Sequence, residues 1–369
     1  MKKVMVLISI FILGMSTACA EDKIYLEETS LTLAIGLDLD DNNNLIVYQT
    51  NPVFSEEATK KVDIKSAYNV QTLRQAREIF NAMSNGNVVG GKVQVFLFSK
   101  RFLQEENPVK YLDTFLRDPK NAVNVVMAVV DGSVSEVLNA KLEDKPRIAV
   151  YLNNLIERTH RTESTVRTEL DDFYRKIYDK GVTPYMSEIK MGETEILVTG
   201  CALLNDNGTY AISLNKQETS FLLLLQQDVD EPVPITFNIN KGNGNNGTIS
   251  ATLDNISYKI VTDYIEDKFY FDFQIEADAV LSERNYFTNT EEKLNQLAEV
   301  IELRLKHECE DLVKEIQEYE IDPTGLGLYA RAYKYDKWKN AKNNWGETFA
   351  NAEVTVTPKI EIKSFGVIK

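Results

Sequence analysis

Hydrophobic and polar residues alternate along the chain from Phe269 to Ala279. Successive side chains of a β-strand point to opposite faces, so this pattern predicts a strand with one packed face and one face in water. Two shorter strand patterns, at residues 235–239 and 248–253, flank a run of Gly and Asn and predict a β-hairpin. Residues 354–362 alternate again, and Pro358 places this last strand at an edge or a bulge.

Between these strands the hydrophobic period changes to three and four residues. This spacing predicts a long amphipathic helix, and Thr288 with Glu291 forms a capping-box pattern at its start. Its remaining positions are densely charged, as expected for a helix that covers a sheet and faces water. The apolar stripe consists of Leu294, Leu297, Ile301, Leu305, Cys309, Leu312, Ile316 and Tyr319.

The first half of the chain alternates shorter helices and strands. A hairpin is predicted from residues 31–37 and 45–48, which flank an acidic, Asn-rich turn. Such alternation is typical of a layer of helices packed on a sheet. Helices are predicted from Thr72 to Met83, from Val109 to Leu116 and from Thr162 to Gly181, the last with Val166, Leu170, Phe173 and Ile177 on one face, and buried strands at 93–98 and 123–130.

These patterns predict an α+β, multidomain protein. We expect mixed sheets with packed helices in the N-terminal half, and an antiparallel β meander plus one long helix in the C-terminal half. The expected divisions are a signal peptide at residues 1–18, an N-terminal domain at 19–190 and a C-terminal domain at 191–369. The Pro-containing segment 228–234 indicates a further division of the C-terminal domain near residue 232.

The N-terminus has the features of an export signal. Two lysines precede an apolar run at residues 4–15, and small residues then lead to Cys19. The run is shorter than the roughly 20 residues that a membrane-spanning helix needs. Two processing outcomes remain open: Cys19 becomes the first mature residue and is lipidated, or Ala18-Cys19-Ala20 is cut before Glu21. Mass spectrometry of the mature N-terminus distinguishes them.

Composition and charge narrow the class of protein. The 369 residues are 43% hydrophobic and 26% charged, which is ordinary for a folded soluble domain and too polar for a protein with many membrane spans. Against 41 Lys and Arg stand 56 Asp and Glu, and the net charge is −15. Because this charge repels phosphate backbones, we expect no nucleic-acid partner.

The sequence contains few residues that are candidates for catalysis or metal binding. The two histidines, His160 and His307, lie in charged stretches, where an exposed side chain is the expected outcome, and the spacing of His and Cys fits no zinc site. We therefore expect no catalytic residue, no metal and no cofactor. Cys201 and Cys309 lie in apolar patterns, so buried free thiols are favoured over a disulfide. A hydrolase that uses two carboxylates remains open, because their separation is set by the fold.

Two loops resemble ligand sites without meeting their requirements. An EF-hand loop beginning at Asp38 would need Gly at its sixth position and Glu at its twelfth, where this chain has Asn43 and Gln49. The Gly-rich run at residues 242–247 joins two predicted strands and lacks the following helix of a phosphate-binding loop. We therefore expect neither calcium nor nucleotide at these loops.

Several short segments occur in a consistent order along nearly the whole chain. They are Leu33-Ala-Ile-Gly-Leu-Asp38 with Asn51-Pro52, Gly90-Gly-Lys-Val-Gln-Val95, Arg117-Asp118-Pro119, Thr168-Glu-Leu-Asp-Asp-Phe173 with Pro184, Gly200-Cys-Ala-Leu-Leu204, and Asp322-Pro-Thr-Gly-Leu-Gly327 with Trp338, Trp345 and Phe349. Together these segments resemble the Ger(x)C family of spore germination proteins. Three positions depart from the usual family pattern: the Trp after the lipidated Cys is absent, Lys92 replaces a common His, and Ser16 stands where lipoprotein signals usually have Leu.

This resemblance implies a non-catalytic lipoprotein subunit of a spore germinant receptor. It implies three mixed α+β domains, a lipid anchor at Cys19 on the extracytoplasmic face of the spore inner membrane, and assembly with integral-membrane A and B subunits. An extracytoplasmic solute-binding lipoprotein is the alternative from another class. The aromatic residues Trp338, Trp345 and Tyr333 are a candidate partner surface, since Trp and Tyr are common at interface hot spots, and packing in the core is the competing interpretation.

Overall fold

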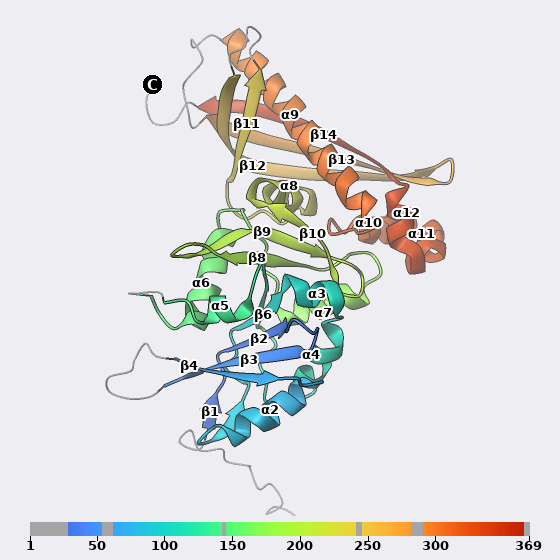
Figure 1. Ribbon diagram of the computed structural model, residues 1–369. Helices are drawn as coiled ribbons and strands as arrows, with labels where there is room; N and C mark the ends of the chain where they lie inside the picture. Colours follow the sequence, from blue (N-terminus) through green and yellow to red (C-terminus); the bar gives the residue numbers. More distant parts are fainter. Residues whose placement is uncertain (1–28, 54–61, 142–144, 241–245, 282–290, 365–369) are drawn as a thin grey trace, which may run out of the picture.

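A computed structural model describes residues 29–53, 62–141, 145–240, 246–281 and 291–364. Figure 1 shows the chain rising from an N-terminal sheet with helices, through a middle region, to a C-terminal sheet crossed by one long helix. The predicted signal peptide, Cys19, Thr288 and most of the Gly/Asn loop lie outside the described residues. The expected α+β class is confirmed, with mixed sheets and packed helices followed by a strand-rich C-terminal half and its long helix.

An eight-stranded mixed sheet forms the N-terminal and middle parts. The strands β6, β7 and β8 run parallel to one another and β6 also runs parallel to β2, while antiparallel pairs complete both edges. A separate two-stranded parallel sheet joins β1 (Thr29–Leu31) to β5 (Asn87–Val89). The order across the large sheet is β10 (Tyr210–Asn215), β9 (Ile196–Leu204), β8 (Tyr185–Met191), β7 (Val126–Val130), β6 (Val95–Ser99), β2 (Ala34–Leu39), β3 (Leu45–Pro52) and β4 (Val62–Tyr68).

Helices cover both faces of this sheet. Alternate side chains of β6 serve the two layers: Phe96 and Phe98 pack with one group of helices, and Val95 and Leu97 with the other. A strand buried on both faces therefore reads as a continuous apolar run, as it does here. The first group is α2 (Leu73–Ala82), α3 (Lys100–Glu105), α4 (Val109–Leu116) and α7 (Leu170–Tyr178); the second is α5 (Val134–Leu138) and α6 (Ile148–His160).

The predicted start of a helix at Thr162 is wrong. The chain turns instead through Glu163, whose backbone φ is 52°, and α7 begins at Leu170. Two buried hydroxyls hold this turn: Thr165 donates to the Gly200 carbonyl at 2.6 Å and Thr168 to the Tyr185 carbonyl at 2.8 Å. Side-chain hydrogen bonds of this kind compete with helix, and helix α6, which the patterns did not predict, ends just before them.

The C-terminal sheet has the order β11 (Val233–Asn240), β12 (Asn246–Ile265), β13 (Lys268–Leu281) and β14 (Glu353–Ser364). The alternation along β13 is confirmed, with its apolar positions buried. β11, β12 and β13 form the expected antiparallel meander, and β14 is an edge strand as Pro358 predicts. However, β14 runs parallel to β13, because the intervening helices carry the chain back to the start of β13.

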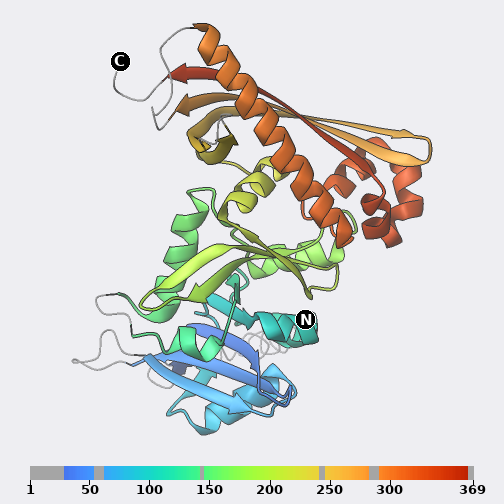
Figure 2. The same cartoon turned by 45° about the horizontal axis from the view of Figure 1, so that its top comes forward.

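The long helix α9 (Glu291–Glu318) crosses one face of this sheet, as Figures 1 and 2 show. Its predicted stripe is buried from Leu297 to Ile316, whereas Tyr319, just beyond the helix end, is exposed. Helix α8 (Lys216–Gln226) lies between the two sheets, and its leucines join side chains of β9, β11 and α9 in one continuous core. The two sheets are therefore packed through shared apolar contacts. The division at residue 191 stays a prediction.

Candidate functional site

The segment Asp322-Pro-Thr-Gly-Leu-Gly327 folds around one buried carboxylate. It follows α9 and leads into α10 (Leu326–Tyr333), and Gly325 takes a left-handed φ of 76° that suits glycine. The Asp322 carboxylate accepts five hydrogen bonds: from the Thr324 hydroxyl at 2.6 Å, from three backbone N–H groups at 2.8 to 3.2 Å, and from the Trp345 indole at 2.8 Å. Every donor that faces this carboxylate is thus satisfied by it.

This network is structural in character. It joins the end of α9 to α12 (Trp345–Ala350), and the Asp322 carbonyl accepts a hydrogen bond from the Thr183 N–H at 2.9 Å, beside the start of β8. Burial raises the pKa of Asp322, and the hydrogen bonds from Thr324 and Trp345 oppose that shift. The carboxylate is enclosed by the chain's own donors, so it is not placed to act on a substrate.

The structure assigns the predicted aromatic residues to different environments. Trp338, on α11 (Tyr335–Ala341), and Trp345 are only 6% and 5% exposed, so both indoles pack in the core. Tyr333 is 66% exposed at the end of α10. The interface interpretation therefore needs correction for the two indoles, since a buried ring cannot offer its face to a partner. Tyr333 is the member of the predicted surface that faces solvent.

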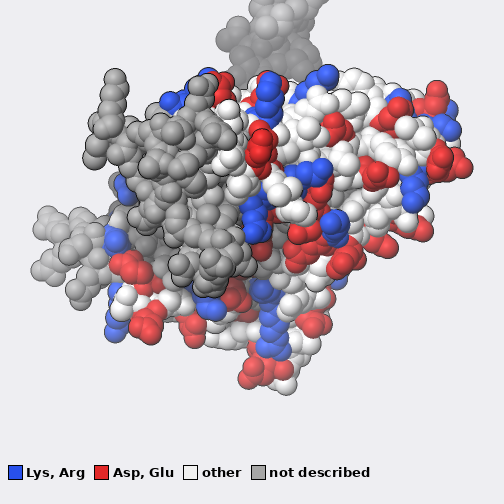
Figure 3. All heavy atoms as spheres, turned by 90° about the horizontal axis from the view of Figure 1, so that it is seen from above, with Lys and Arg blue, Asp and Glu red and all other residues white. Residues whose placement is uncertain are grey.

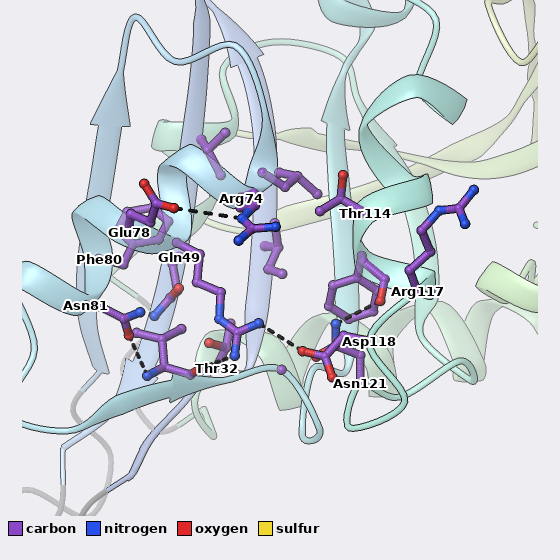
Figure 4. Close-up of a pocket in the computed structure, with 17 residues that line it drawn as sticks. Thr32, Gln49, Arg74, Glu78, Phe80, Asn81, Thr114, Arg117, Asp118 and Asn121 are labelled. Carbon is purple, nitrogen blue, oxygen red and sulfur yellow. Dashed lines mark hydrogen bonds and ion pairs between the residues drawn. The ribbon is translucent and has the colours of Figure 1, made fainter.

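A cavity of about 650 Å³ lies between α2 and α4, over strands β2 and β3. Figure 4 shows Gln49, Thr32, Asp118 and Asn121 among the polar side chains that line it. Apolar side chains from the same helices and strands complete the wall: Ile35, Val47, Leu73, Phe80 and Phe115. Polar and apolar side chains thus share one concave surface, and small-molecule pockets combine groups of both kinds.

The charged groups of this cavity are already paired. Arg77 donates to the Asp118 carboxylate at 2.9 Å and to the Val88 carbonyl at 3.0 Å, and Arg74 lies 3.8 Å from Glu78. The hydrogen bond from Arg77 lowers the pKa of Asp118, so this acid is ionised at neutral pH. A glycosidase-like mechanism needs a carboxyl group that holds a proton near pH 7. Asp118 does not provide one.

Two neutral groups inside the cavity are notable. Thr32 is 1% exposed, and its hydroxyl oxygen is buried without a hydrogen-bond partner among the described residues. Gln49 is 3% exposed and donates from its amide nitrogen to Asn51 at 2.8 Å, which leaves its amide oxygen as an acceptor. The patterns did not identify this site. Polar residues at 49–51, in a strand that is otherwise apolar and buried, were the available signal.

The remaining candidate groups are not arranged for catalysis. His160, at the end of α6, contacts the Thr165 carbonyl through Nδ1 at 3.0 Å, and His307 is exposed on α9. Cys201 and Cys309 are free and buried, and burial raises the pKa of the Cys201 thiol to about 12. A thiol that stays protonated is a poor nucleophile. Within the described ranges, no group of three His, Cys, Asp or Glu side chains is placed to hold a metal ion.

The carboxylates of the acidic turn after β2 accept hydrogen bonds from the protein's own backbone. The Asp40 carboxylate accepts from the backbone N–H of Asn42 and of Asn44 at 2.8 Å, and the hydrogen bonds from Asn44 lower its pKa. Asp38 points the other way and accepts from the Val134 N–H at 3.0 Å, at the start of α5. The two carboxylates therefore serve a turn and a helix end.

None of the helices in the described part of the chain is long and apolar enough to cross a membrane. Any attachment through Cys19 involves residues outside that part. The lipidation of Cys19 therefore stays a prediction.

Comparison with known proteins gives a consistent result. Residues 22–191 match the family described as spore germination protein N-terminal domain, and residues 199–366 match spore germination B3/GerAC like, C-terminal. The spore germination protein YndF of Bacillus subtilis (strain 168) is 24% identical over 318 residues, which cover 80% of this chain and 71% of YndF. The crystal structure of the GerBC protein superposes with a TM-score of 0.59 at 15% identity, covering 89% of this chain and 96% of that one.

Proposed function

Because this chain belongs to the Ger(x)C family of spore germination proteins, we propose that it is the non-catalytic lipoprotein subunit of a nutrient germinant receptor. The observation that carries this proposal is the match of two germination-family domains, in order, over residues 22–191 and 199–366. The paired charges of the α2/α4 cavity and the protonated buried thiols agree with a protein that works by binding.

In this proposal the chain assembles with integral-membrane A and B subunits on the extracytoplasmic face of the spore inner membrane. Lipid on Cys19 would hold it there, since two acyl chains give stable anchoring at about 0.8 kcal/mol per buried CH₂. The protein surface is not basic enough to replace that anchor. On the described part of the face in Figure 3, Lys and Arg are interspersed with Asp and Glu, and the chain as a whole carries a charge of −15.

The subunit would act by stabilising one of two receptor states. A subunit that binds both states equally cannot shift their equilibrium, so its contacts with A and B must be stronger in the nutrient-responsive state. Its eight-stranded and four-stranded sheets, packed through one shared core, make it suitable as a rigid scaffold for such contacts.

Deleting the chain tests the proposal directly. We expect spores without it to lose the response to one nutrient while keeping the response to non-nutrient triggers, and a wild-type copy to restore that response. Germination is measured by the fall in optical density of a spore suspension. Deletion spores that respond normally to every nutrient tested contradict a receptor role.

The exposed Tyr333 gives a sharper test of the partner surface. Tyr333→Ala should reduce co-purification of the A and B subunits about tenfold, because truncating an interface hot spot costs ~1.4 kcal/mol or more. Tyr68→Ala is the matched control, since Tyr68 is 61% exposed on β4, at the far edge of the large sheet. Equal recovery of partners by both variants would remove Tyr333 from the interface. Loss of partners with both would indicate a general defect.

A further inference from the structure

We propose that the cavity between α2 and α4 binds a small, uncharged, polyhydroxylated ring, of the monosaccharide or cyclitol class. The inference concerns the chain by itself, so it does not depend on assembly with membrane subunits. It rests on three features of the cavity: a buried hydroxyl without a partner, charges that are neutralised in pairs, and apolar and aromatic walls beside amide groups.

The unpartnered hydroxyl of Thr32 indicates a place for a ligand. A buried polar group that makes no hydrogen bond is costly, and one that persists in a folded protein calls for an explanation. Thr32 lies in the wall of a cavity of about 650 Å³, so a ligand in the cavity would lie beside this side chain. Its backbone is held by a hydrogen bond from its N–H to the Val89 carbonyl at 3.0 Å, which keeps the side chain in place.

The charged side chains around the cavity are paired with one another, which favours an uncharged ligand. Arg77 is neutralised by Asp118 and also satisfied by the Val88 carbonyl, and Arg117 pairs with Asp113 at 2.7 Å. Arg74 and Glu78 lie within 3.8 Å of each other on the exposed surface of α2. An ionic ligand would meet arginines and carboxylates that already neutralise one another, so it would gain no unpaired counter-charge. An uncharged ligand leaves all of them intact.

The neutral groups of the cavity indicate which functional groups a ligand would carry. The Gln49 amide oxygen can accept a hydrogen bond, while the Thr32 hydroxyl can both donate and accept. Hydroxyl groups on a ligand match this mixture, since each can donate to one group and accept from another. Phe80 and Phe115 line the same space, and their apolar surfaces suit the C–H face of a saturated ring. Amide, hydroxyl and aromatic groups are thus combined in one cavity.

The test uses three rings of the same size that differ in charge. Purified full-length chain is titrated at millimolar concentration with methyl β-glucoside, which is neutral, with glucosamine, which is a cation, and with glucuronate, which is an anion. Binding is followed by saturation-transfer NMR and calorimetry. We expect the neutral ring to bind most tightly. Stronger binding of either charged ring, or no binding of the neutral ring, would overturn the proposal.

Two variants locate the binding. Thr32→Val keeps the shape of the side chain and removes the hydroxyl, so we expect the neutral ring to bind about tenfold more weakly. Its melting temperature should be equal to or above that of the wild type, because an unsatisfied buried hydroxyl is lost. Leu73→Trp, on the wall formed by α2, fills the cavity and should abolish binding.

The matched control is Thr183→Val. The Thr183 hydroxyl is also buried without a hydrogen-bond partner among the described residues, but Thr183 lies at a different depression, beside the β9–β10 turn and Trp345. This variant should therefore bind the neutral ring as the wild type does. Unchanged binding in Thr32→Val and Leu73→Trp, or an equal loss in Thr183→Val, would place the ligand elsewhere and contradict the assignment.

Discussion

Asp322→Ala is expected to lower the free energy of unfolding by roughly 3–5 kcal/mol. The substitution leaves five buried donors without their acceptor, and an unsatisfied buried donor costs about 1–3 kcal/mol even though neighbouring groups relax in part. Asp322→Asn should be nearly as destabilising, because its amide NH₂ faces N–H donors instead of accepting from them. Urea unfolding followed by circular dichroism measures the change.

Two comparisons make this result specific to the hydrogen-bond network. Trp345→Phe removes one donor and leaves the other four, so it should cost less than Asp322→Ala. Asp336→Ala removes an exposed carboxylate that pairs with Lys339 at 2.7 Å on α11, and should change stability little. If the free energy of unfolding of Asp322→Ala stayed within about 1 kcal/mol of the wild-type value, the buried carboxylate would not be what joins α9, α10 and α12.

Gly200→Ala is expected to be comparably damaging, at roughly 3 kcal/mol or more. Gly200 has φ 146°, a conformation that side chains disfavour at a cost of about 1–3 kcal/mol. An added Cβ would also lie 2.0 Å from the Leu214 carbonyl oxygen and 2.7 Å from the Asn215 carbonyl carbon. Both atoms belong to the backbone of β10, which pairs with β9 here, so the two strands must separate. Thermal and urea unfolding measure the loss.

Gly132→Ala separates the two causes. Gly132 has a similar φ of 135°, but nothing lies within 4 Å of the position of an added Cβ. It should therefore show only the conformational cost, about 1–3 kcal/mol. The difference between the two variants measures the close approach of β9 and β10. Equal destabilisation would show that this approach contributes nothing.

Much of the local structure follows from the sequence. The alternation in β13 and the apolar stripe of α9 both predicted the buried face, because each period depends only on the geometry of its own strand or helix. The Thr72 cap is confirmed as well, since its hydroxyl accepts from the Gln75 N–H at 3.1 Å, three residues away. Family membership also came from the sequence, through separate motifs in a fixed order.

The candidate site was less accessible to sequence reasoning. Trp338 and Trp345 are equally suited to a core and to an interface, and only burial by residues distant in the chain separates the two roles. The cavity, too, is formed by residues that are distant in the chain. Thr32, Gln49 and Asp118 come from three separate parts of the chain, and no spacing along the sequence relates them.

The sequence by itself therefore determined many of the strands and helices, which of their faces are apolar, and the family, although it missed α6 and placed the start of α7 too early. Only the tertiary structure decided that β14 runs parallel to β13, that β8, β9 and β10 extend the N-terminal sheet, and that one carboxylate collects five donors. The physical reason is the range of the interactions. Periodicity is set by neighbours within a few residues, whereas strand direction, burial and cavities are set by contacts between residues far apart in the chain.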